Sequence, residues 1–224
     1  MTHKLDKLYE GLPIFVISTG TSLRGFDFSR LNGQITIGIN RVIEHYQPSI
    51  LHFIDRTAHK THAEALRNYN GMIIAGEGAA PTNSHMNVFE IKRNIDTFEL
   101  SGNMTTLSRK VGRSFSDGLY GGGAGCTALH TAILLGGDPI YLLGYDYYQD
   151  NGTHFDEYDE SRNGENFDSI SYDISMDGVE TLARQTWIPR IYNCNPKSRM
   201  TAFPNVEITT VLAHDVKTQT ATVK

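Results

Sequence analysis

The chain has 224 residues, of which 39% are hydrophobic and 20% charged, and its net charge is -5. This is enough for one large α/β domain with its own core. We expect no signal peptide and, because no run approaches ~18 consecutive apolar residues, no membrane span. The net charge argues against a broad electrostatic attraction to nucleic acid, with a local basic patch left open. Two isolated cysteines, Cys126 and Cys194, indicate neither a disulfide framework nor a zinc cluster. We therefore expect a cytoplasmic protein with a single domain over residues 1–224.

Short apolar runs in the first half of the chain predict parallel β-strands. These runs cover residues 14–18, 34–40, 50–55 and 72–75, with a weaker candidate at 88–91. The first three lead into polar groups, namely the turn Gly20-Thr21-Ser22, then Asn40, then Asp55. Open α/β sheets bind ligands outside the carboxyl ends of their strands, so we expect these residues on one rim of one sheet. An acid buried at such a strand tip would be costly unless it binds something, which favours Asp55 as a ligand-binding residue.

A glycine-rich loop at residues 121–125 leads into an Ala/Leu/Ile helix that ends near Gly136. Bare amides at a helix N-terminus favour an anion, and glycine lets a phosphate approach the backbone closely. The run at 139–146 then predicts a buried strand that ends in the carboxylate of Asp146. Gly123, Ala124 and Gly125 are therefore candidate phosphate-binding residues. The open alternative is that the glycines only allow the helix to pack tightly on the sheet.

The last third of the chain predicts a lid and then a return to the sheet. An irregular, acidic stretch suggests a lid segment over 147–172, because long loops in compact domains are often functional. We expect a helix over 177–186, a strand over 190–194 and a turn at 195–198. The tail from Thr209 is expected to fray or to pair at a sheet edge. The alternation predicts a Rossmann-like α/β domain with a mainly parallel sheet and helices on both faces.

Asp146, Tyr148 and His154 form the strongest candidate catalytic group. The carboxylate could orient a sugar hydroxyl or fix the tautomer of His154, and a histidine can act as acid or base near neutral pH. The alternative is a carboxylate bonded to loop amides beside an exposed histidine. His59 and His62 lie three residues apart and could converge on a metal ion, but no cysteine or further acid joins them. We expect solvated histidines there and no metal site.

Several of these motifs together resemble one superfamily, that of the bacterial lipooligosaccharide sialyltransferases. The motifs are the turn at 19–23, Asn40, the glycine-rich loop with the strand that follows it, and the turn at 195–198. The same pattern is similar to archaeal hydroxymethylpterin diphosphokinase-like proteins and to phage proteins of unassigned function. The resemblance extends over about residues 12–205. It implies a sialyltransferase-like fold that binds a cytidine monophosphate sugar without requiring a metal.

The resemblance also implies roles for individual residues. The nucleotide and phosphate of the donor would be contacted by Gly20, Thr21, Ser22, Asn40, Asp55, Gly123, Ala124, Gly125 and Ser198. Tyr148 matches a tyrosine that steadies the leaving phosphate, and His154 falls about where a second such tyrosine stands. Ser18 and Thr21 replace the first glycine and the proline of the family turn, and Ala124 replaces a loop serine. The catalytic histidine of the family falls near Tyr172.

Three hypotheses follow. The first is a transferase that uses a nucleotide-activated donor, in particular a nucleotide-sugar-dependent glycosyltransferase that needs no cofactor and acts on an unknown acceptor. The second is a diphosphokinase-like enzyme that requires Mg²⁺, for which the acidic segment 156–160 is a candidate ligand. The third is a non-catalytic nucleotide-binding or sequestering protein, because no histidine lies between His154 and His214. A homo-oligomer, and the host cytoplasm of a phage-infected cell as location, stay open.

Overall fold

The structure of the protein is a computed structural model that describes residues 5–55, 58–80, 87–91, 93–94, 111–147, 155 and 169–213. The strands in these residues are β1 (Ile14–Ile17), β2 (Ile35–Ile39), β3 (Ile50–Phe53), β4 (Met72–Gly76), β5 (Asn87–Ile91), β6 (Arg93–Asn94), β7 (Leu119–Tyr120), β8 (Ile140–Leu143) and β9 (Ile191–Asn193). The α-helices are α1 (Ala58–Thr61), α2 (Ala63–Leu66), α3 (Ala124–Leu134) and α4 (Ser169–Ala183), and residues 208–213 form a further short helix. The 3-10 helices are η2 (Thr21–Leu23), η3 (Phe28–Leu31), η4 (Asn40–Glu44) and η5 (Phe115–Asp117).

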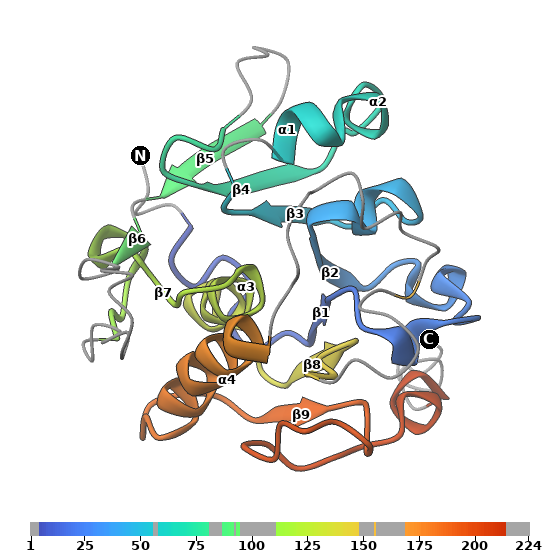
Figure 1. Cartoon of the computed structure of the whole chain (residues 1–224), viewed down its shortest axis with the longest axis vertical. Helices are drawn as coiled ribbons and strands as arrows, with labels where there is room; N and C mark the ends of the chain where they lie inside the picture. Colours follow the sequence, from blue (N-terminus) through green and yellow to red (C-terminus); the bar gives the residue numbers. More distant parts are fainter. Residues whose placement is uncertain are drawn as a thin grey trace, which may run out of the picture.

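Seven strands form one sheet in the order β5-β4-β3-β2-β1-β8-β9, which runs as a ladder from top to bottom in Figure 1. Every neighbouring pair in this sheet is parallel, and β6 and β7 form a separate short parallel pair. The chain moves outward from β1 to β5 and then returns to place β8 on the other side of β1. The carboxyl ends of β1 and β8 are therefore the topological switch point, where open α/β sheets bind ligands.

Alternation along β1 separates the two faces of the sheet, because successive side chains of a strand point in opposite directions. Ile14 and Val16 pack in a cluster with α3, α4 and the N-terminal segment. Phe15 and Ile17 pack on the other face, with η2, η3, η4 and the helix at 208–213. Farther along that second face, α1, α2 and η4 cover β3 and β4. Helices thus lie on both faces of a parallel sheet, as the sequence predicts.

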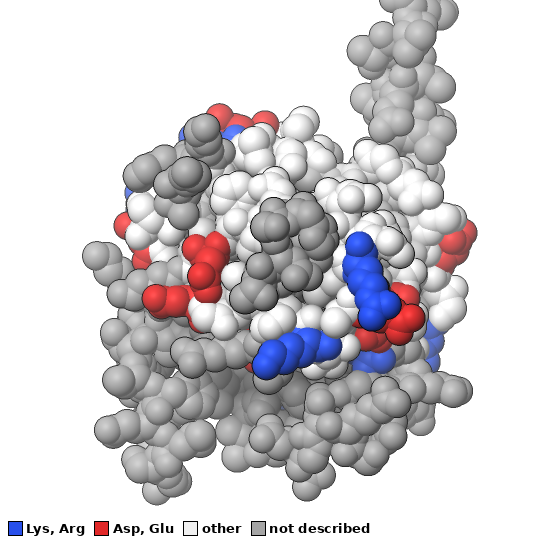
Figure 2. Space-filling model, turned by 90° about the horizontal axis from the view of Figure 1, so that it is seen from above, with Lys and Arg blue, Asp and Glu red and all other residues white. Residues whose placement is uncertain are grey.

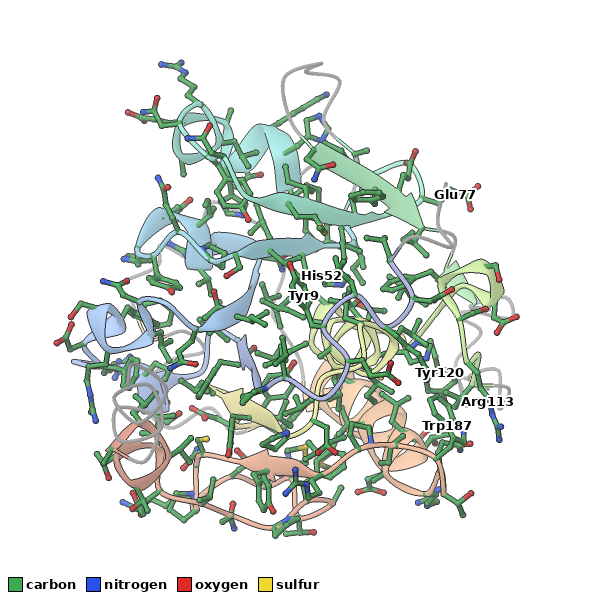
Figure 3. The ribbon with its side chains drawn as sticks, turned by 180° about the vertical axis from the view of Figure 1, so that it is seen from behind. Tyr9, His52, Glu77, Arg113, Tyr120 and Trp187 are labelled. Atoms are coloured by element: carbon green, nitrogen blue, oxygen red, sulfur yellow. The ribbon has the colours of Figure 1, made fainter. Side chains whose placement is uncertain are left out.

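Polar side chains are buried together where α3 packs on the sheet. Thr127, His130 and Thr131 are fully buried in α3, and His52 is fully buried in β3 and lies near the middle of the molecule (Figure 3). Nε2 of His52 lies 2.8 Å from Oγ1 of Thr127. The hydroxyl of Thr127 donates to the carbonyl of Ala124 at 3.1 Å, so Nε2 of His52 donates to Thr127. These bonds satisfy polar groups that would otherwise destabilise the core.

The C-terminal end of α3 is capped by the segment that begins the described chain. The carbonyls of Leu134, Leu135 and Gly136 accept hydrogen bonds from the amides of Lys7, Tyr9 and Gly11. The last carbonyls of a helix have no partner inside it, so this segment replaces the missing turn.

A cation–π contact joins the residues before η5 to those after α4. The guanidinium carbon of Arg113 lies 5.3 Å from the centre of the Trp187 ring (Figure 3).

Two sequence-based expectations are wrong near the C-terminus. The predicted helix over 177–186 begins earlier and ends earlier, as α4 at Ser169–Ala183. Apolar and polar residues alternate from Ile170 to Met176, a pattern that resembles a strand, and packing against α3 fixes the helix instead. Residues 208–213 are helical and bury Val211 and Leu212 on β1, so this part of the tail neither frays nor pairs with an edge strand. Most of the predicted lid lies outside the described residues, and its last residues, 169–172, belong to α4.

Charged side chains of both signs lie on the described part of the face seen from the β5 end. There, Lys and Arg side chains lie among Asp and Glu side chains on a largely uncharged surface (Figure 2). This agrees with the net charge of -5. Among the described residues, no helix combines the length and apolarity needed to cross a bilayer.

Candidate functional site

The switch point is built by close contact between the loops that follow β1 and β8. The amide of Gly20 donates to the carbonyl of Gly144 at 3.1 Å. A Cβ on Gly20 would lie 2.4 Å from that carbonyl oxygen and 2.5 Å from Cγ of Asp146. Only glycine lets the two loops approach this closely. The predicted turn glycine therefore has a packing role at the switch point, and contact with a donor nucleotide stays a prediction for it.

Asp146 joins three loops at this point. Its Oδ1 accepts hydrogen bonds from Oγ of Ser22 at 2.6 Å and Nδ2 of Asn195 at 2.8 Å. Its Oδ2 accepts from the amide of Ser22 at 2.7 Å, with Oγ1 of Thr21 at 3.5 Å. The residue is only 3% exposed. The carboxylate thus holds the loops after β1, β8 and β9 together, and a direct role in catalysis stays a prediction.

The turn at 195–198 is tied to the same loop by backbone bonds. The hydroxyl of Ser198 donates to the carbonyl of Tyr145 at 2.6 Å and accepts from the amide of Met200 at 3.0 Å. The amide of Arg199 donates to the carbonyl of Asp146 at 3.0 Å. This turn is confirmed. The hydroxyl of Ser198 is engaged inside the protein, and the predicted contact between Ser198 and a nucleotide is untested.

The glycine-rich loop has a packing explanation of its own. Gly121 has φ +130, and a Cβ there would lie 2.6 Å from Sγ of Cys126. A Cβ on Gly123 would lie 3.0 Å from Oγ of Ser175 in α4. The hydroxyl of Tyr145 donates to the carbonyl of Gly125 at 2.9 Å. Tight packing thus accounts for Gly121 and Gly123, whereas a Cβ on Gly125 would meet its nearest atom only at 3.5 Å. Phosphate binding by Gly123, Ala124 and Gly125 stays a prediction.

The helix α3 nevertheless leaves amides at its start that no residue of the helix bonds. Its first intrahelical bond runs from the amide of Thr127 to the carbonyl of Gly123. The amides of Ala124, Gly125 and Cys126 precede that bond, as the first turn of any helix requires.

The two cysteines are both protonated near neutral pH. Burial raises the pKa of the Cys126 thiol and raises that of Cys194 to about 12. Both thiols are free and stay protonated near neutral pH, so neither suits a thiolate nucleophile.

Asn40 follows β2 in a conformation that few residues other than glycine adopt, asparagine being among the commonest of them. Its φ is +48, in the left-handed region. Its Oδ1 is shut off from solvent and has no hydrogen-bond partner in the described part of the chain. Such an atom loses its hydrogen bonds to water without replacement, which costs about 1–3 kcal/mol. Buried polar groups without a partner are uncommon in folded proteins, so Asn40 is a candidate for donor binding.

Asp55 lies on the same rim, because β2 and β3 are parallel neighbours. It is exposed, which contradicts our argument that a buried acid would need a ligand. The strand β3 stops at Phe53, two residues earlier than predicted, so Asp55 stands in the loop that leads to α1. The predicted contact between Asp55 and a donor is untested.

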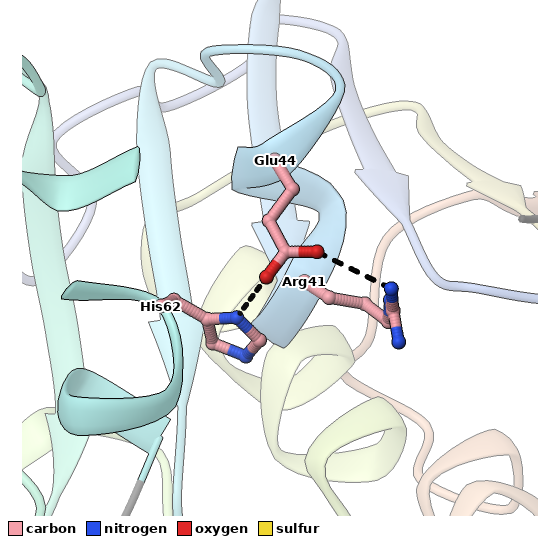
Figure 4. A network of polar contacts seen from close by, with 3 residues as sticks. All are labelled: Arg41, Glu44 and His62. Atoms are coloured by element: carbon pink, nitrogen blue, oxygen red, sulfur yellow. Dashed lines mark hydrogen bonds and ion pairs between the residues drawn. The ribbon is translucent and has the colours of Figure 1, made fainter. Parts of the chain in front are cut away.

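Beside these two residues lies a polar network that the sequence did not reveal (Figure 4). Nδ1 of His62 lies 2.7 Å from Oε1 of Glu44, and Oε2 of Glu44 lies 3.2 Å from Nη2 of Arg41. Arg41 and Glu44 belong to η4, directly after β2, and His62 precedes α2. His62 is 9% exposed, so its prediction as a solvated histidine is wrong, because Glu44 approaches it from the neighbouring loop. The sequence did hold one indication of this network, since charged residues follow both β2 and β3, two neighbouring buried strands.

Two of the predicted catalytic residues, Tyr148 and His154, lie outside the described residues. The nearby Phe155 is described, and its amide donates to the carbonyl of Thr19 at 2.8 Å, which ties residue 155 to the end of β1. In the part of the chain that the structure describes, no three His, Cys, Asp or Glu side chains converge as a metal site would require.

Comparisons with known proteins identify the fold. No protein-family model matches the chain, and no curated protein matches it in sequence. The sialyltransferase CstII from Campylobacter jejuni, in complex with the substrate analogue cytidine-5'-monophosphate, aligns with a TM-score of 0.53 and 14% identity over 88% of this chain and 85% of that chain.

Two further structures agree. CST-II with a trisaccharide acceptor and CMP aligns at a TM-score of 0.51 and 16% identity, over 87% of this chain and 85% of that chain. The monofunctional α-2,3-sialyltransferase Cst-I from Campylobacter jejuni aligns at 0.52 and 14% identity, over 87% and 80%. The predicted sialyltransferase-like α/β fold is therefore confirmed.

Proposed function

We propose that this protein is a glycosyltransferase that takes a sugar from a nucleotide-activated donor. The observation that carries the proposal is Asn40, whose amide oxygen is buried without a partner among the described residues and whose backbone has a positive φ. An N–H or O–H of a nucleoside would supply the missing hydrogen bond once the Asn40 side chain turns toward the rim, because this oxygen is shut off from solvent in the structure. The solved structures of similar fold that hold CMP support a nucleoside monophosphate as the carrier.

The donor would lie across the carboxyl ends of β1, β2 and β3, with its phosphate toward the start of α3. The amides of Ala124, Gly125 and Cys126, which have no partner inside the helix, would stabilise the charge that develops on the leaving phosphate. Asp146 would act as a positioning residue that holds the loops after β1 and β8, and Tyr148 and His154 would face the leaving group.

Thermal unfolding in the presence of candidate ligands tests the proposal. CMP, UMP, ATP, CMP-sugars and UDP-sugars would each be added with Mg²⁺ or with EDTA, since a ligand at 100 times its Kd stabilises the folded state by about 2.7 kcal/mol. We expect a shift with a cytidine or uridine ligand that EDTA leaves unchanged, together with slow hydrolysis of the matching nucleotide sugar. Absence of a shift with every nucleotide would overturn the proposal.

Two other results would favour the alternatives. A shift with ATP that requires Mg²⁺ would favour a diphosphokinase-like enzyme. Nucleotide binding without hydrolysis or transfer of any sugar would favour a binding or sequestering protein.

A further inference from the structure

A chain of hydrogen bonds, called here the His52 relay, runs from the middle of the sheet to the start of α3. It begins at His52, which is fully buried in β3 near the middle of the molecule (Figure 3). Nε2 of His52 lies 2.8 Å from Oγ1 of Thr127. That hydroxyl lies 3.1 Å from the carbonyl oxygen of Ala124 and 3.3 Å from that of Gly123. A threonine hydroxyl has one proton, which the two carbonyls share, so the imidazole donates from Nε2.

The His52 relay ends on the peptide groups that carry the first amides of α3. A trans peptide is planar, so the carbonyl of one residue and the amide of the next lie in one plane and point in opposite directions. The carbonyl of Gly123 therefore fixes the amide of Ala124, and the carbonyl of Ala124 fixes the amide of Gly125. Because Thr127 holds both carbonyls along the helix, both amides point out of its start.

The third amide of this turn is held in the same way by a different residue. The carbonyl of Gly125 shares a plane with the amide of Cys126 and accepts the hydroxyl of Tyr145 at 2.9 Å. Tyr145 follows β8 and is 2% exposed. Glycine accepts many backbone conformations, so a loop as rich in glycine as 121–125 would otherwise let these peptides turn. Buried side chains thus fix all three amides that the proposed function assigns to the leaving phosphate.

The His52 relay also begins beside the candidate nucleoside-binding residue. Register pairs His52 with Ile39 of β2, the residue before Asn40. Neighbouring strands lie about 4.8 Å apart, and the side chain of His52 alone spans the space from there to the first turn of α3. Asn40 and the start of α3 are therefore close enough for one nucleotide to reach both.

We propose that His52, acting through Thr127, is a positioning residue for the leaving phosphate, because it holds the amides of Ala124 and Gly125 in the direction that the transition state requires. This role rests on the proposed function. Donors that are fixed in advance need no rearrangement as charge develops, and loss of one such donor lowers kcat about 10²–10³-fold. A relay that aims two donors without removing them should contribute less, about tenfold to 100-fold.

Isosteric variants of Thr127 test this role. Thr127→Val keeps the shape of the side chain but removes the hydroxyl. We expect kcat for donor hydrolysis to fall about tenfold to 100-fold with the donor KM within about threefold, because the charge on the phosphate grows only in the transition state. Thr127→Ser keeps the hydroxyl and should recover kcat to within about threefold of the wild type.

Thr131→Val is the matched control. Thr131 is fully buried one turn deeper in α3, and its hydroxyl donates to the carbonyl of Thr127 at 2.9 Å, away from the first amides. We expect this variant to lose stability as Thr127→Val does, while kcat stays within about twofold of the wild type. If Thr127→Val also changes only the unfolding temperature and keeps the wild-type kcat per folded molecule, the proposal is overturned.

Variants of His52 test whether the histidine acts through Thr127. His52→Gln keeps an N–H near the place of Nε2, whereas His52→Leu removes it. We expect kcat to fall about tenfold in His52→Leu and less than about threefold in His52→Gln. His52→Leu and Thr127→Val combined should be no slower than Thr127→Val, because residues that act in series are not additive. Independent, additive losses would contradict the relay.

A measurement on the free protein separates failure of this role from failure of the proposed function. Residual dipolar couplings report the direction of each N–H bond. We expect the couplings of Ala124 and Gly125 to change in His52→Leu and in Thr127→Val, and to keep their wild-type values in Thr131→Val. Unchanged couplings would overturn the role of His52 whether or not a nucleotide binds. Changed couplings in a protein that binds no nucleotide would instead overturn the proposed function, and the phosphate role with it.

Discussion

Two parts of the same sheet edge treat their polar groups in opposite ways. In the switch-point cluster of Gly20, Ser22, Asp146, Asn195 and Ser198, hydrogen bonds inside the protein engage both oxygens of Asp146 and the hydroxyls of Ser22 and Ser198. At the β2–β3 edge, made of Asn40, Asp55 and the contacts among Arg41, Glu44 and His62, one amide oxygen is buried and unpaired among the described residues, and the carboxylate of Asp55 is exposed.

This difference indicates that the switch-point cluster supports the fold and that the β2–β3 edge is the part that binds a ligand. A buried network whose donors and acceptors are all hydrogen bonded inside the protein stabilises the fold but has few groups left to bind a ligand. A strained or unsatisfied group lowers stability and is retained where a ligand completes it. Substitutions in the switch-point cluster should therefore act on stability, and substitutions at the β2–β3 edge should act on binding and turnover.

The largest effect is expected from Asp146→Ala. It removes the acceptor of two Ser22 bonds and one Asn195 bond from a residue that is 3% exposed. We expect the free energy of unfolding to fall by about 3–4 kcal/mol, measured by urea denaturation, because buried donors lose their partners. Asp27→Ala is the control, since Asp27 accepts two bonds from Ser29 at an exposed site and should cost far less. Equal losses in the two variants would refute the distinction.

Gly20→Ala is expected to come next. The new Cβ would lie 2.4 Å from a backbone oxygen and 2.5 Å from Cγ of Asp146, so the loops must separate, at a cost of about 2–3 kcal/mol. Gly125→Ala is the matched control in α3, where the nearest atom to the new Cβ is 3.5 Å away. Alanine favours the helix there, so stability should rise by about 0.5–1 kcal/mol. Urea midpoints that order the two variants the other way would contradict this account of the switch point.

A pH titration of stability extends the comparison to His130, both of whose ring nitrogens are hydrogen bonded inside the protein. Burial lowers the pKa of His130 to about 4. The folded state therefore binds this proton less readily than the unfolded state, whose pKa is about 6.5. The stabilisation is complete above pH 6.5 and is lost as the pH falls toward 4, at about 1.4 kcal/mol per pH unit. Urea unfolding between pH 6.5 and 5 should show this slope, and His130→Gln should lack it; an unchanged slope in that variant would assign it to other groups.

The smallest effect on stability, and a clear one on binding, is expected at Asn40. At φ +48 glycine fits better than alanine, so Asn40→Gly should leave stability unchanged or higher, and Asn40→Ala should lose about 1 kcal/mol. Both variants lack the amide oxygen, so calorimetry should show about tenfold weaker binding of CMP, or about 1.4 kcal/mol. Wild-type affinity in Asn40→Gly would remove Asn40 from the donor site.

Most of the sheet could be predicted from the sequence because each strand is marked by the character of a few neighbouring residues. Continuous apolar runs mark β1 and β8 as buried parallel strands, and an Ala/Leu/Ile run between glycines marks α3. Asn40 and Asp146 follow strands whose parallel pairing places their carboxyl ends on one rim. The start of α4 was missed because apolar and polar residues alternate from Ile170 to Met176, which is not the repeat of a helix.

The sequence alone therefore determined the strands, the main helix and the candidate rim, since these depend on the character of neighbouring residues. The tertiary structure decided which polar groups meet. Ser22 and Asp146 are 124 residues apart and Glu44 and His62 are 18 apart, and both pairs form only because of the strand order and the close approach of the loops. Local periodicity carries no record of strand order, because that order follows from how the two apolar faces of the sheet are covered. The hydrogen bonds to both oxygens of Asp146, and the contact between His62 and Glu44, could thus be found only in the folded chain.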